Sequence, residues 1–145
     1  MSYEIFRLLH LVAVFAFAGA LVIENIAIKP DISGEDARNL AKVDAVCGLS
    51  ALLLVVFGLT LWFGVGKPSS FYSANPIFAV KLGMVVLMGL LAVASAPFFR
   101  RHRHSEAETI AVPRYLQLAL RFQLVLLLLI PLLAMLMARG IGLSA

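Results

Sequence analysis

Charged residues are scarce in this sequence. They make up 14% of its 145 residues, whereas soluble domains contain about 25%. The shortage excludes an ordinary soluble domain, and it indicates that water is not the main solvent of the chain.

Cysteine is the second scarce residue. Cys47 is the only one, which excludes an internal disulfide and every metal site built from paired cysteines. The sequence also has no glycine-rich phosphate loop, and no serine or cysteine stands in a recognisable nucleophile motif. Nucleotide-binding and hydrolytic functions therefore lack their motifs. We expect no nucleic-acid partner, because the basic residues behind the net charge of +4 lie beside apolar segments.

Apolar residues are what the sequence does contain. They form 62% of the chain, and the mean hydropathy is +0.99. A helix needs about 20 mostly apolar residues to cross the roughly 30 Å hydrocarbon layer of a lipid bilayer. Four stretches meet that length, at about 5–28, 43–66, 76–99 and 115–138. They predict one all-α transmembrane domain over residues 1–145, an antiparallel up-down-up-down four-helix bundle.

The first apolar stretch also has features of a cleaved signal peptide. Arg7 precedes it, and Ala16-Phe17-Ala18 resembles a small-residue cleavage site. Its apolar run continues to Ile28, however, which is longer than the ~7–15 residue core of a signal peptide. We therefore favour a membrane span.

The distribution of Lys and Arg predicts the orientation of the bundle. The connections after the first and third stretches carry most of them: Lys29, Arg38, Lys42, Arg100, Arg101, Arg103 and Arg114. The other side has Arg7, Lys67 and Arg139. Because positive loops stay in the cytoplasm, we expect a multi-pass protein of the bacterial inner membrane with both termini in the periplasm. This topogenic role explains the basic run 100–104 better than lipid-headgroup binding, or metal binding by His102 and His104.

Ionisable residues inside the apolar stretches are the first candidates for function, because each costs several kcal/mol at membrane depth unless it is paired or hydrated. One group falls within about two turns of the predicted cytoplasmic helix ends: Glu24, Asp44, Gln117 and Arg121. We expect a buried charge cluster in which Arg121 binds Glu24 or Asp44. The cluster either fixes the register of the helices or forms part of a proton or ion path.

A second group lies at similar depth in the outer half of the bundle. It contains His10, Trp62 and Lys81, with Met84 and Met135 nearby. Simpler explanations are that Lys81 extends to the interface, that His10 is hydrogen-bonded between helices, and that the methionines only pack. The thioethers and the histidine would also suit Cu(I).

Three short segments resemble the HemJ-type membrane protoporphyrinogen oxidases and their CopD-like relatives. They are 6–12 (FRLLHLV), 17–19 (FAG) and 78–82 (FAVKL). The resemblance implies that His10 and Lys81 are the functional, catalytic pair and that His10 is the metal ligand of a haem b. Haem iron also takes a second axial ligand such as Met or His. His10 is the only histidine inside a span, so Met84, Met135 or a second copy of the chain would occupy the opposite position, with Trp62 beside the cofactor.

Nearly the whole chain is also similar to an uncharacterised family of small bacterial four-helix membrane proteins. The similarity lies in residues 44–49 (DAVCGL), 66–68 (GKP) and 72–76 (YSANP). It implies no activity. Three functions therefore remain: a haem-associated redox protein, a small copper or proton-linked transport protein, and a membrane assembly factor without chemistry.

Overall fold

The computed structural model of the chain describes residues 2–65 and 76–139. Four long helices dominate it: α1 (Ser2–Ala27), α2 (Gly34–Thr60), α4 (Pro76–His102) and α5 (Arg114–Ala138). A π-helical turn, η1 (Leu61–Val65), extends α2, and two short strands lie in the connections, β1 (Asp31–Ser33) and β2 (Thr109–Ala111). All four helices are long and apolar enough to cross a membrane. The prediction of an all-α four-helix membrane bundle is confirmed.

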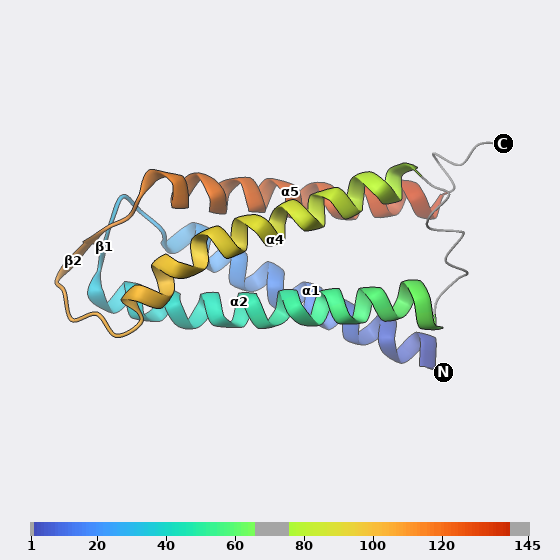
Figure 1. Cartoon of the computed structure of the whole chain (residues 1–145), viewed down its shortest axis with the longest axis horizontal. Coiled ribbons are helices and arrows are strands. Elements are labelled where there is room, and N and C mark those ends of the chain that lie inside the picture. Colours follow the sequence, from blue (N-terminus) through green and yellow to red (C-terminus); the bar gives the residue numbers. More distant parts are fainter. Residues whose placement is uncertain (1, 66–75, 140–145) are drawn as a thin grey trace.

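The helices alternate in direction along the bundle (Figure 1). α1 starts and α5 finishes at one end, and β1 and β2 lie at the other, which we call the strand end. Contacts join α1 to α2, α2 to α4, α4 to α5 and α5 back to α1. The helices therefore form a ring in which α1 has α2 and α5 as neighbours.

Large apolar side chains cover the outside of the bundle. Phe15, Val93 and Leu128 are each more than 70% exposed. In water such exposure would be unfavourable, whereas lipid chains solvate these side chains well. The most buried large apolar residues, Leu21 and Phe99 among them, lie toward the strand end, so packing is densest there.

The two strands join the two helical hairpins. β1 pairs antiparallel with β2, with Ile32 opposite Ile110, and both of these isoleucines are buried. A further bond runs from the Val112 amide to the Pro30 carbonyl, at 2.8 Å. Neither strand was predicted, and both segments were expected to be connections between helices. Three-residue strands with one inward side chain each are too short to give a recognisable alternating pattern.

Two helices extend beyond the predicted apolar stretches. α2 begins at Gly34 rather than near residue 43, because Ser33 caps it: the Ser33 hydroxyl accepts from the Asp36 amide at 3.0 Å. α4 continues to His102 rather than stopping near residue 99, so Arg100 and Arg101 are helical. Hydropathy marks the part of a helix inside hydrocarbon, and both extensions are polar. The predicted end of the second stretch, at 66, lies outside the described residues.

Gly34 stands where the first turn of α2 meets the main chain of the loop before β2. A Cβ atom at this position would lie 2.0 Å from the carbonyl oxygen of Ala107. We expect Gly34→Ala to lower the free energy of unfolding by about 1–3 kcal/mol, since main chain must move to admit the methyl group. Thermal unfolding of the purified protein in detergent measures this.

The matched control for this prediction is Gly89→Ala in α4. A Cβ atom at Gly89 would meet nothing within 4 Å, and alanine is the better helix former. The control should leave stability unchanged or raised. Equal losses in both variants would contradict the role given to Gly34.

Candidate functional site

Glu24 lies near the strand end of α1 and is only 1% exposed. The next residue, Asn25, is 2% exposed, and its side-chain amide donates to the Leu21 carbonyl at 2.9 Å. Oε1 of Glu24, by contrast, is buried without a hydrogen-bond partner. Burial of a carboxylate oxygen is costly unless a donor satisfies it.

The polar side chain that faces Glu24 is Asp44 of α2. The two carboxyl groups interact by charge and by a hydrogen-bonding contact. Ionised carboxylates only accept hydrogen bonds, so neither can supply the donor that the other lacks. Two negative charges held together away from water also repel each other strongly. A proton shared between the carboxyl groups removes both problems.

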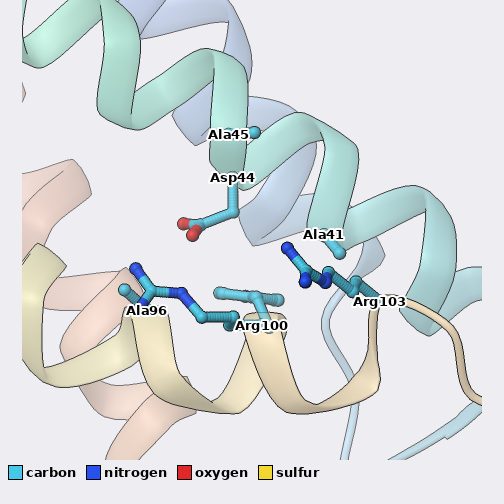
Figure 2. A pocket seen from close by; sticks show the side chains of 7 residues that line it. Ala41, Asp44, Ala45, Ala96, Arg100 and Arg103 are labelled. Atoms are coloured by element: carbon cyan, nitrogen blue, oxygen red, sulfur yellow. The ribbon is translucent and has the colours of Figure 1, made fainter.

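The Asp44 side chain also lines a cavity of about 170 Å³ that lies between α2 and α4. Figure 2 shows the Asp44 carboxyl group pointing from α2 toward α4, with the Arg100 and Arg103 guanidinium groups on the facing side. The charge of Arg100 acts on Asp44. Ala41, Ala45 and Ala96 line the same cavity, and their small side chains leave the space open.

Arg121 does not form the predicted ion pair with Glu24 or Asp44. Its Nη1 instead donates to the Asn25 main-chain oxygen at 2.7 Å, with a longer contact of 3.4 Å to the Asn25 Oδ1. The reason is the free carbonyl: α1 ends at Ala27, so the Asn25 oxygen has no amide one turn later within the helix to accept from. Arg121 thus tethers α5 to the end of α1.

Gln117 also binds main chain rather than an acid. Its side-chain amide donates to the Val112 carbonyl at 3.2 Å. The predicted four-residue cluster therefore divides: the structure brings Glu24 and Asp44 together, while Arg121 and Gln117 satisfy carbonyl groups near helix ends.

Uncharged polar residues are what the sequence analysis missed. Gln123 of α5 is buried, and its amide donates to the Met88 carbonyl of α4 at 3.0 Å. Asn25 is buried beside Glu24 and accepts from Arg121. A lone Asn or Gln inside an apolar segment is expensive without a partner, which is the signal that identifies such contacts.

His10 and Lys81 lie in the half of the bundle away from the strands. The charge of Lys81 acts on His10. The His10 ring packs on α2, where a Cβ atom at Gly58 would be 3.5 Å from its Cε1, and it makes a hydrogen-bonding contact with the Leu54 main chain. Its Nδ1 is buried without a partner.

Trp62 lies on the π-helical turn η1. Its ring stacks on Phe63 at 4.2 Å between centroids and meets Phe78 edge-on at 4.8 Å. The indole Nε1 is buried without a hydrogen-bond partner. Of the two methionines expected nearby, Met84 is partly buried against the core, whereas Met135 is 50% exposed.

Metal-ligating side chains do not cluster in the described ranges. Among residues 2–65 and 76–139, no three His, Cys, Asp or Glu side chains gather where they would hold a metal ion. A metal at His10 would need thioether or external ligands.

The model of one protein family matches residues 3–142, nearly the full length of the chain. The family is described as "Predicted membrane protein (DUF2214)". The chain belongs to this family. The predicted membership of an uncharacterised membrane-protein family is confirmed, and the four spans make this DUF2214 member a multi-pass membrane protein. No curated protein and no solved structure matches the chain.

The Arg121 tether gives a direct test in this DUF2214 protein. Arg121→Met removes a charged donor from the Asn25 carbonyl, and we expect it to lower the free energy of unfolding by about 1–2 kcal/mol. Arg114→Met, at the exposed start of the same helix, should cost much less. Thermal unfolding in detergent compares the two variants, and an equal cost would contradict the tether.

Proposed function

We propose that this chain is a proton-linked transport protein in which Glu24 and Asp44 carry the proton. The observation that supports this is the buried pair of acceptors, with Oε1 of Glu24 left without a donor. Ionisable groups inside membrane spans characteristically form proton relays. A shared proton satisfies the pair, and its departure leaves a repulsive pair that binds a proton again.

The cavity supplies access to the pair from one side. It reaches Asp44 from the strand end of the bundle, beside the last turns of α4. A proton entering there meets Asp44 first and passes to the more deeply buried Glu24. Arg100 lines the same cavity and places a positive charge at this end of the route.

Titratable groups in the other half of the bundle suit the far end of such a route. His10 and Lys81 interact there, and one His10 nitrogen is free of protein partners. Between the two halves, Ser50, Ser95 and Gln123 are the buried polar side chains along α2, α4 and α5. Coupling of proton movement to a second solute, such as copper held by Met84 and His10, would use the same route.

Proton flux into liposomes tests the proposal. Liposomes containing the purified protein and an internal pH dye should acidify after an imposed pH gradient faster than protein-free liposomes. Glu24→Gln and Asp44→Asn remove the titrating groups, so each should reduce the rate to that of protein-free liposomes.

Glu35→Gln is the matched control. Glu35 is an exposed carboxylate on the first turn of α2, away from the pair, and its loss should leave the flux unchanged. Wild-type flux no greater than that of empty liposomes, or an equal loss in the Glu35 variant, would contradict the proposal.

The orientation that we propose places the strand end in the cytoplasm and both termini in the periplasm of a bacterial inner membrane. α1 begins and α5 ends at the end of the bundle opposite the strands, and the excess of Lys and Arg lies at the strand end. A fluorescent reporter fused after Arg103 should therefore fluoresce in the cytoplasm. A phosphatase fused after Ala145 should be active in the periplasm, and an inactive phosphatase there would reverse the orientation.

Haem b is a second proposal, favoured by the free Nδ1 of His10 near Lys81. An imidazole nitrogen is a normal axial ligand of haem iron. The fit of a porphyrin is incomplete, because Gly58 packs on the imidazole ring of His10 and Met135 is half exposed. A second copy of the chain would have to complete the site, and we assign no reaction step to haem.

An absorption spectrum tests the haem proposal. Purified protein that binds haem should show a Soret band that His10→Ala abolishes and Lys81→Ala retains in part. A colourless protein, or an unchanged band in His10→Ala, would remove haem. A chain with no haem, no copper and no proton flux would be a membrane assembly factor.

A further inference from the structure

Arg100 lies in the last turn of α4, Arg103 follows just beyond the end of the helix at His102, and both line the cavity beside Asp44. Figure 2 shows the Arg100 guanidinium group beside Ala96 and the Arg103 guanidinium group beside Ala41, with the Asp44 carboxyl group between them in this view. Neither guanidinium has a protein partner among the hydrogen bonds and ion pairs of the described residues. Guanidinium groups present paired N–H donors that match the oxygens of a phosphate group.

The walls and position of the cavity suit an occupant of this kind. Its volume is about 170 Å³, and three of the residues that line it are alanines, whose small side chains leave space between α2 and α4. Arg100 lies in the last turn of α4 and Arg103 directly follows its end, so both stand at the end of a helix that is long and apolar enough to span a membrane. Lipid phosphates lie at this depth, and basic pockets between helices are known to bind lipid headgroups.

We propose that the cavity between α2 and α4 binds a phosphate group, held by Arg100 and Arg103. The two guanidinium groups outnumber the single carboxylate that lines the cavity, so its charge favours an anion. The phosphate belongs either to the headgroup of an anionic membrane lipid or to free phosphate, since both present the same oxygens.

Asp44 on the facing wall gives the site a second property. While ionised, it repels a phosphate in the cavity and competes for Arg100. Neutral Asp44 removes both effects, so replacing it with asparagine should tighten binding. A zwitterionic ligand that used Asp44 for an ammonium group would instead lose affinity in the same variant.

Binding by the full-length protein in detergent tests the proposal with two probes. Retention of phosphatidylglycerol is measured by native mass spectrometry, with uncharged diacylglycerol as the comparison lipid. Radiolabelled inorganic phosphate is measured by equilibrium dialysis. Arg100→Gln and Arg103→Gln should each weaken binding about tenfold, the usual effect of losing one charged hydrogen-bonding partner.

Arg101→Gln is the matched control, since Arg101 is exposed in the same helical turn but does not line the cavity. Arginine-dependent retention of phosphatidylglycerol without phosphate binding supports a lipid, and arginine-dependent phosphate binding supports a free anion. Binding of neither probe, an equal loss in Arg101→Gln, or weaker binding in Asp44→Asn would overturn the proposal. A chain that binds phosphate but moves no protons would contradict only the proposed transport.

Discussion

Every polar group inside the four spans must find its partner within the bundle, because hydrocarbon supplies none. The structure meets this requirement mostly with main-chain carbonyls. Gln123 donates to α4, Arg121 to the end of α1 and Ser95 to its own helix. The first two contacts fix the depth of α5 relative to α4 and α1, which apolar side chains in lipid do only weakly.

The same requirement identifies where the protein is incomplete by itself. Three buried polar atoms in the described part of the chain lack a partner: Oε1 of Glu24, Nδ1 of His10 and Nε1 of Trp62. The first belongs to an acidic pair at the strand end, and the other two lie in the opposite half. A donor suits the Glu24 oxygen near Asp44, and an acceptor suits the Trp62 N–H. The other ring nitrogen of His10 donates to the Leu54 main chain, so Nδ1 carries a lone pair and suits a donor or a metal ion. Unsatisfied polar groups therefore occur in both halves of the bundle.

Hydropathy predicted the four spans and their alternation because hydrocarbon imposes a minimum apolar length on every crossing helix. It located α5 closely, at 115–138 against Arg114–Ala138. It placed the start of α2 too late, since a serine cap and two acidic residues govern that end rather than apolarity. The two strands were not predicted because residues 31–33 pair with residues 109–111, which lie far away in the sequence. No local sequence pattern indicates that pairing.

For the site, helical periodicity predicted depth and face but not neighbours. Glu24 and Asp44 lie near each other because α1 and α2 are adjacent and joined by a short connection. Arg121 lies on the face of α5 that meets α1, but it donates to the free main-chain carbonyl of Asn25 and not to a carboxylate. The hydrogen-bond partner of such a side chain depends on where the neighbouring helix ends, because the last carbonyl groups of a helix are free to accept. The apolar pattern of the sequence does not show that end point.

The pairing of β1 with β2 sets an order for biosynthesis. β1 leaves the ribosome early, but its partner follows only after α2 and α4 have been made. Until then Ile32 is not covered by Ile110. The hairpin of α1 and α2 must therefore remain in the membrane without the strand pairing that joins it to the hairpin of α4 and α5. The strand end therefore closes late, as the step that converts two inserted helical hairpins into one body.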